Sequence, residues 1–256
     1  MNDETPDGST PMEYAKALCA HAKEQGLEVP IYTTGANFFV KEPEKELERL
    51  CRHIDIAAEC KIPLLRHDVA WGYYEGYTGI KSYKKVIEAV APLVRQTAEY
   101  ARERGVKTCS ENHGYLLQDS VRMLELFAAV DHPNYGFLCD MGNFTVVDED
   151  CATAVSALSD YIVHVHAKDM LVRSGMNFDP GRGYNLSRGG NYWRGTIFGH
   201  GNVPTFQILS AIRKSGYDGY VSLEFEGMEP VLEGVEIGTQ NLQHMIEVIG
   251  EGQRYV

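Results

Sequence analysis

The sequence predicts an α/β fold in which six parallel strands alternate with helices, as in an incomplete (β/α)₈ barrel. Two observations predict it. Apolar residues with helical spacing alternate with short apolar runs, and parallel sheets with right-handed crossovers arise from this alternation. Polar residues gather where each run ends, as on the functional rim of a barrel. We expect residues 1–256 to form one domain, since this length suits a single barrel.

The expected helices are identified by their caps and apolar stripes. Thr10 and Glu13 form a capping box, Pro11 suits the first turn, and Gly26 ends this first helix. The later helices are predicted from apolar residues three or four positions apart. They run through residues 47–57, 86–101, 121–127, 152–158, 206–212 and 242–249.

The expected strands are short apolar runs between these helices. They are Leu27–Thr33, Pro63–Asp68, Val106–Glu111, Tyr135–Asp140, Tyr161–His166 and Tyr220–Glu226. A closed barrel has eight strands, so the first two are missing and an open sheet would expose two edges. A partner chain could cover the gap, the N-terminal segment could cross it, or Met1 could be a late start of a longer natural protein. We favour the late start.

A long segment, residues 170–199, interrupts the alternation. It is rich in Gly, Asn and Arg and has no apolar periodicity. Segments of this length in a compact domain are usually lids, binding loops or disordered. We interpret it as an active-site loop.

Composition excludes several classes of protein. The formal net charge of −12 argues against a nucleic-acid partner, since such proteins carry basic patches. No apolar run is long enough to cross a membrane, and the polar start lacks a signal pattern. The six cysteines form no C-x-x-C pair. We therefore expect a cytoplasmic protein with reduced thiols.

Four strand ends carry groups that bind metal ions. They are Glu111, Asp140, His166 and Glu224. Strand ends converge on one rim of a parallel barrel, and three carboxylates with one imidazole suit Mn²⁺, Mg²⁺ or Co²⁺. A lone Asp at a strand end is often a helix cap or turn former instead, so the prediction depends on the coincidence of four. His164 and Glu226 share strand parity with two of them and are alternatives.

Further side chains near these strand ends are candidates for substrate contact. Trp71 could add a flat surface over a sugar, whereas Arg66 could pair with Asp68 instead. A carboxylate could also orient a ligating histidine, and the arginines of the long segment could bind an acidic substrate or be solvated. The candidates are Arg66, His67, His113, Asn143, Lys168, Asp169 and His200.

Several motifs resemble a known family. They are Glu111-Asn112-His113, Cys139-Asp140-Met141-Gly142-Asn143, His164-Val165-His166-Ala167-Lys168-Asp169, Gly199–Pro204 and Gly216–Glu224. From residue 11 onward the chain resembles the xylose-isomerase-like sugar phosphate isomerase/epimerase superfamily, which has a TIM-barrel fold. The resemblance implies one divalent ion on Glu111, Asp140, His166 and Glu224, with both glutamates as acid and base. It favours His166 over His164. Family epimerases often have His where this chain has Asn143.

The chemistry of such a site fits several reactions. A divalent ion polarises a ketone oxygen and acidifies the neighbouring C–H, so two carboxylates could isomerise or epimerise a sugar or sugar-like ketone. Loss of a β-hydroxyl would instead make a lyase acting on an inosose or keto-glycoside. A phosphodiesterase would need several metals, and a non-catalytic binding barrel is the alternative of another class. We expect a carbohydrate substrate, and a homo-oligomer is compatible with the sequence.

Overall fold

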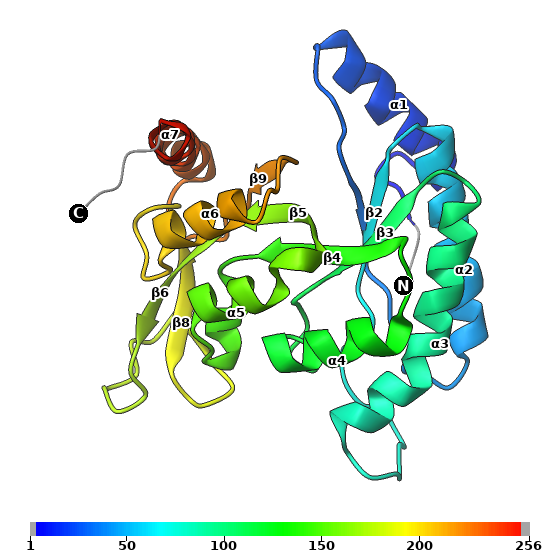
Figure 1. Ribbon diagram of the computed structural model, residues 1–256, viewed down its shortest axis with the longest axis horizontal. Helices are drawn as coiled ribbons and strands as arrows, with labels where there is room; N and C mark the ends of the chain where they lie inside the picture. The colour runs from blue at the N-terminus through cyan, green and yellow to red at the C-terminus, as the bar shows by residue number, and fades with distance from the viewer. Residues whose placement is uncertain (1–3, 252–256) are drawn as a thin grey trace. The chain divides into compact units, whose positions relative to one another are not determined.

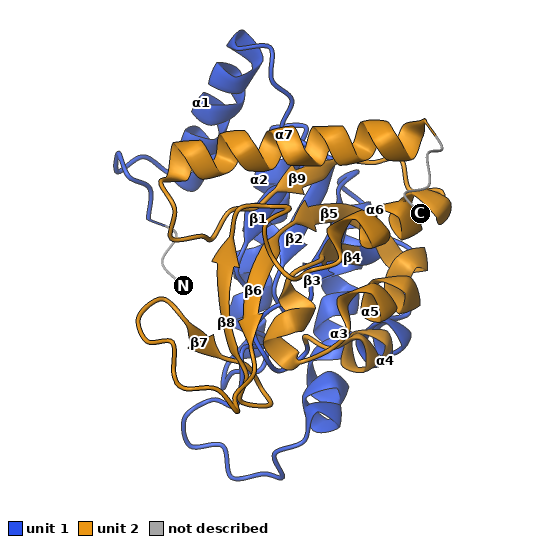
Figure 2. Cartoon of the chain, turned by 90° about the vertical axis from the view of Figure 1, so that its left-hand side faces the viewer, with its two compact units in different colours: residues 1–117, 125–136 blue, residues 118–124, 137–256 orange. Residues whose placement is uncertain are grey.

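The computed structural model describes residues 4–251, which divide into two compact units (Figure 2). Unit 1 is the chain up to residue 117 together with residues 125–136. Unit 2 is residues 118–124 together with the chain from residue 137 onward. The single domain expected over residues 1–256 stays a prediction.

Unit 1 holds a parallel sheet in the order β1-β2-β3. Helices α2 and α3 pack together, α2 against β2 and α3 against β3 (Figure 1). The strands are β1 (Tyr32–Thr34), β2 (Leu64–His67) and β3 (Lys107–Glu111). The helices are α1 (Pro11–Glu24), α2 (Pro43–Glu59) and α3 (Tyr83–Arg102), and α4 (Ser120–Val130) begins in unit 2 and ends in unit 1.

The first helix begins where its capping box predicts. The Glu13 N–H donates to Thr10 Oγ1 at 3.3 Å, and the Thr10 N–H donates to Glu13 Oε2 at 2.9 Å. After the helix, Gly26 has a φ of +72°, a left-handed conformation that favours glycine. Both predicted ends of α1 are confirmed.

The core of unit 1 consists of the apolar stripes of two amphipathic helices. Leu50 and Ile54 of α2 are fully buried, as are Val86, Val90 and Val94 of α3. Burying such side chains contributes about 1.5–3 kcal/mol each. This packing fixes the positions of β2 and β3, and with them the side chains at their carboxyl ends.

Unit 2 holds β4, β5 and β9 as parallel neighbours. Helix α7 packs along β9 and α6, and α6 packs on α5 (Figure 2). The strands are β4 (Tyr135–Asp140), whose first two residues belong to unit 1, β5 (Ile162–Ala167) and β9 (Val221–Leu223). The helices are α5 (Cys151–Leu158), α6 (Thr205–Lys214) and α7 (Val231–Gly250), with 3₁₀ turns η1 (Asn143–Val147) and η2 (Ser159–Tyr161).

The predicted strand count is confirmed. Residues 4–251 contain six strands in parallel pairings, three in each unit, so the fold is TIM-barrel-like with six of the eight strands of a closed barrel. Four strands are shorter than predicted. β2 and β3 differ by one or two residues, whereas β1 starts only at Tyr32 and β9 ends already at Leu223. Over the same residues, no helix combines the length and apolar character needed to cross a lipid bilayer.

Residues 170–199 are more regular than predicted. They contain most of an antiparallel sheet in the order β6-β8-β7, built from β6 (Asp169–Arg173), β7 (Asn185–Leu186) and β8 (Tyr192–Thr196). Its far end is attached to η1 by Asp148, whose carboxylate accepts from Ser187 Oγ at 2.6 Å and Asn191 Nδ2 at 2.7 Å. The Gly189 N–H donates to the same carboxylate. The expectation of an irregular segment is therefore wrong, and its place in an active site stays a prediction.

Candidate metal centre and substrate site

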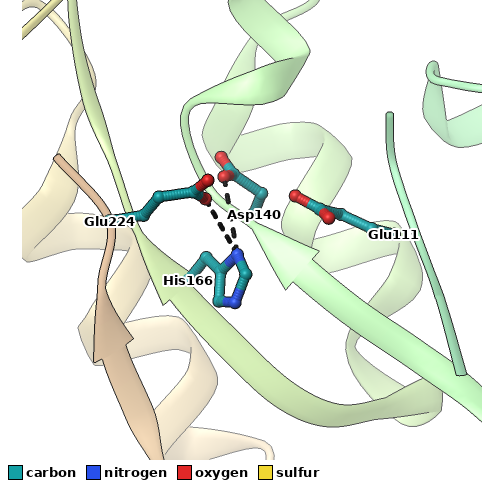
Figure 3. Close-up of side chains that lie close together, drawn as sticks. All are labelled: Glu111, Asp140, His166 and Glu224. Atoms are coloured by element: carbon teal, nitrogen blue, oxygen red, sulfur yellow. Dashed lines mark ion pairs between the residues drawn. The ribbon is translucent and has the colours of Figure 1, made fainter. Parts of the chain in front are cut away.

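Three of the predicted metal ligands lie together in unit 2. Asp140 ends β4, His166 lies in β5, and Glu224 directly follows β9. The parallel register pairs Asp140 with His166 and His166 with Ser222, so the strand ends are level. Figure 3 shows the three side chains directed toward one another. His166 Nδ1 is 2.9 Å from Glu224 Oε2 and 4.0 Å from Asp140 Oδ2.

The turn after β4 fixes the Asp140 carboxylate. Its Oδ1 accepts the backbone N–H groups of Gly142 at 2.8 Å and Asn143 at 2.9 Å, so Oδ2 is directed toward His166. A Cβ on Gly142 would lie 3.0 Å from the Lys168 carbonyl oxygen. The turn approaches the end of β5 so closely that a side chain at this position would require its neighbours to shift.

Lys168 lies between the acidic groups of this cluster. Its Nζ is 3.1 Å from Asp140 Oδ2, 3.2 Å from Glu224 Oε2 and 3.3 Å from Glu226 Oε2. It also donates to Asn143 Oδ1 at 3.3 Å. The lysine side chain is only 4% exposed, and a buried ammonium needs such partners. The structure thus brings two predicted substrate contacts, Lys168 and Asn143, to the predicted metal ligands.

Electrostatics keep Glu224 ionised. Burial acts to raise the pKa of this carboxyl, but the hydrogen bond with His166 and the charge of Lys168 outweigh it, and the pKa falls well below its usual range. An ionised carboxylate can bind a cation or accept a proton.

The donor set of these three residues fits a hard divalent ion. One ligand atom from each lies within 4.8 Å of the others. Two carboxylates and an imidazole are common ligands of Mn²⁺, Mg²⁺ and related ions. The Lys168 ammonium next to them demonstrates that the cluster attracts positive charge.

Glu111, the fourth predicted ligand, ends β3 in unit 1, where Arg66 organises the acidic groups. Arg66 Nη2 is 2.6 Å from Glu111 Oε2 and 2.8 Å from Asp68 Oδ1. The same Asp68 oxygen is 3.0 Å from His113 Nδ1. This hydrogen bond raises the pKa of His113, against the opposing effect of burial. Predicted substrate contacts Arg66 and His113 therefore belong to one polar cluster with Glu111.

His67 lies apart from this cluster. Adjacent strand residues point to opposite faces, so His67 faces away from its neighbour Arg66. His67 is fully buried. Its ring packs edge-on against Phe38 and stacks on Tyr135, with 6.1 Å between ring centroids in both pairs. Its Nδ1 is 2.8 Å from the Asp68 carbonyl oxygen. The structure gives His67 a place in the core rather than among the polar strand-end groups.

Asp169 connects β6 to the segment that follows β8. Its carboxylate accepts four backbone N–H groups, from Met170 at 2.8 Å, Gly199 at 3.0 Å, Gly201 at 2.7 Å and Val203 at 3.2 Å. Burial raises the pKa of this carboxyl although the four donors favour its ionised form. The Asp169 carboxylate is thus occupied by backbone.

The remaining candidates lie outside the ligand cluster. His164 Nε2 is 2.8 Å from Ser222 Oγ, and His200 is exposed. Sequence reasoning missed two features: Lys168 as a bridge between carboxylates, and an aromatic cluster after β2. The tyrosine-rich run Trp71–Tyr77 was the available signal for the second.

Comparison with known proteins identifies the family. The family model described as "Xylose isomerase-like TIM barrel" matches residues 3–249. The chain belongs to this family. The match extends over both units and includes the four strand ends at which the ligands were predicted.

Individual relatives of the chain differ in their activities. An inosose dehydratase from Lacticaseibacillus casei is 28% identical over 142 residues, covering 54% of this chain and 47% of that protein. The match therefore spans about half the length of this curated relative. The structure of a 3-keto-D-glucoside 4-epimerase from E. coli gives a TM-score of 0.68 at 17% identity, covering 91% of this chain and 85% of the other.

A magnesium complex is also similar in fold. A xylose isomerase-like TIM barrel protein from Mycobacterium smegmatis, solved in complex with magnesium, gives a TM-score of 0.67 at 17% identity. The comparison covers 96% of this chain and 93% of the other. At this identity, the likeness establishes the fold.

Proposed function

We propose that the protein is a divalent-metal-dependent isomerase or epimerase of a sugar or sugar-like ketone. The observation that carries the proposal is the convergence of Asp140, His166 and Glu224 at level strand ends, within reach of one ion. Family membership and the magnesium in the M. smegmatis relative support it. When bound, the ion would polarise the substrate carbonyl and acidify the neighbouring C–H.

Glu111 completes the proposed ligand set. It ends β3 as Asp140 ends β4, and its carboxylate is buried and held by Arg66. We assign proton transfer to Glu111 and Glu224: one removes the proton beside the carbonyl, and the other returns one. Arg66 pairs with the Glu111 carboxylate at 2.6 Å and so orients it for this role. Lys168 and Asn143 are the proposed contacts to substrate hydroxyl groups.

A lyase is the second candidate, and two observations favour it. The curated relative from L. casei is named an inosose dehydratase, and Asn143 stands where family epimerases often have His. The same proton abstraction followed by loss of a β-hydroxyl would dehydrate the substrate. Isomerase and lyase therefore share the site and differ in the fate of the carbanion.

The metal is tested by calorimetry on chelator-treated protein with Mn²⁺, Mg²⁺ and Co²⁺. We expect about one ion per chain and loss of binding in Asp140→Asn. Glu226→Gln is the matched control, because Glu226 contacts Lys168 but is outside the ligand set. Unchanged binding in Asp140→Asn would refute the ligand assignment.

The reaction is tested with a panel of ketoses and inososes in D₂O with Mn²⁺. An isomerase or epimerase is expected to show a primary isotope effect on the C–H beside the carbonyl, or deuterium at that carbon. A lyase would instead release water and form a conjugated carbonyl that absorbs in the ultraviolet. Metal binding without turnover of any substrate would favour a non-catalytic barrel.

A further inference from the structure

The segment after β2 is an aromatic loop fixed by ring contacts. Phe39 lies 6.0 Å from Tyr73, 5.5 Å from Tyr74 and 5.3 Å from Tyr77, measured between ring centroids. Tyr73 and Tyr77 also stack at 5.4 Å. This stretch has no helix or strand, so these contacts define its conformation.

Trp71 differs from the tyrosines of this loop because it is 50% exposed. Its ring lies against the next strand connection: a Cβ on Gly114 would be 3.7 Å from Trp71 Cδ1. Gly114 directly follows His113, whose ring reaches Asp68. Trp71 is therefore a neighbour, within unit 1, of the cluster that holds Glu111.

A cavity of about 630 Å³ opens beside Trp71 and Tyr74, a size typical of ligand pockets. Its other walls carry both signs of charge, and several of these charges are already paired. Lys45 Nζ is 2.6 Å from Glu42 Oε1, and Arg49 Nη2 is 2.9 Å from Glu46 Oε1. A phosphate or an ammonium would meet like charges as well as opposite ones. A neutral ligand with many hydroxyl groups fits this lining better, because carboxylates, amides and cations all hydrogen-bond hydroxyls.

We propose that this cavity binds a neutral pyranose ring, so that the substrate is a glycoside whose second sugar stacks on Trp71. The apolar face of a sugar suits an exposed indole, and Asn37, Lys41 and Glu75 on the cavity wall supply hydrogen bonds. The inference rests on the proposed function, since the reacting ring would lie at Glu111. The fixed aromatic loop lowers the entropy cost of binding.

Fluorescence of Trp71 tests this inference directly. The chain has two tryptophans, so Trp193→Phe leaves Trp71 as the single reporter. We expect cellobiose or maltose to change its emission saturably, and D-glucose and glucose 6-phosphate to bind at least about tenfold more weakly. Calorimetry with wild-type protein provides the same affinities if Trp193→Phe does not fold.

Variants of Trp71 decide the role of the ring. Trp71→Ala should weaken disaccharide binding about tenfold or more, whereas Trp71→Phe should retain most of it. Ile80→Ala is the control, since Ile80 is exposed on the same segment but outside the cavity lining. Equal disaccharide affinity in Trp71→Ala, or preferential binding of glucose 6-phosphate, would overturn the proposal. Metal uptake is measured on the same variants, so a failure of the metal centre is seen separately.

Discussion

Acidification should destabilise the protein through His67. Burial lowers the pKa of this fully buried imidazole from its ordinary 6.5 to about 4, although its hydrogen bond to the Asp68 carbonyl opposes the change. In the unfolded chain His67 takes up a proton near pH 6.5, whereas the folded protein excludes it until about pH 4. The unfolded state therefore binds more protons in this window, and stability must fall as the pH falls.

The size of the effect follows from the pKa difference. Each pKa unit corresponds to about 1.4 kcal/mol, so the total is about 3 kcal/mol. Of this, about 2 kcal/mol should be lost between about pH 7 and about pH 4.5. That is a large part of the usual stability of a domain, about 5–15 kcal/mol.

Other titrating groups act in different windows or with the opposite sign. Glu46 has a lowered pKa because Arg49 and the Asn37 N–H outweigh its burial, so its contribution is lost only below its ordinary 4.5. The raised pKa of His113 stabilises the fold below pH 6.5, and this contribution is lost at higher pH.

The assay is urea unfolding at a series of pH values for wild type and His67→Leu. The variant should show a flatter dependence of the unfolding free energy between about pH 7 and about pH 4.5, whatever its absolute stability. NMR titration of the His67 ring gives its pKa directly. A measured pKa near 6.5, or equal slopes for both proteins, would refute this reasoning.

Three further substitutions test the site. Asp169→Asn weakens four charge-assisted hydrogen bonds and should lower the free energy of unfolding by about 2 kcal/mol. The loss should appear as a lower Tm and as faster hydrogen exchange at residues 199–203, with Asp179→Asn as the control. Glu111→Gln should reduce turnover at least ~10²-fold. If the same loss of turnover is measured when the variant is saturated with metal, Glu111 acts in proton transfer; recovery of turnover would assign it to metal binding alone. Lys168→Met removes a buried cation and should lower the free energy of unfolding by about 3 kcal/mol in the absence of metal. Saturating Mn²⁺ should stabilise this variant more than it stabilises wild type. Equal stabilisation of both proteins would contradict the bridging role of Lys168.

Much of the fold could be predicted because local signals agree with the tertiary structure. The capping box at Thr10, the apolar stripes of α2 and α3, and the run Tyr135–Asp140 specify their elements within a few residues. The antiparallel sheet was missed because its strands have two to five residues and pair across a long insertion. The pairing of these strands depends on contacts between residues distant in sequence, and the periodicity of apolar residues carries no information on such contacts.

The grouping of the candidate ligands could be predicted in part for the same reason. Asp140, His166 and Glu224 were predicted as ligands because they lie at strand ends, which the register of a parallel sheet places close together. Strand parity alone would have separated His67 from Arg66. The position of Lys168 required the structure, because a long flexible side chain has many rotamers and only the surrounding carboxylates select one.

The two carboxylates that hold the β6-β8-β7 sheet have a consequence for how ligands enter. Asp169 attaches its base and Asp148 attaches its far end to η1, which follows the Asp140 turn. We therefore expect this segment to move little between open and closed states. On the prediction that residues 170–199 line the active site, ligand exchange should be governed by diffusion and desolvation, with little lag from loop closure. The conformational entropy of the loop is then lost when the protein folds, not when the ligand binds.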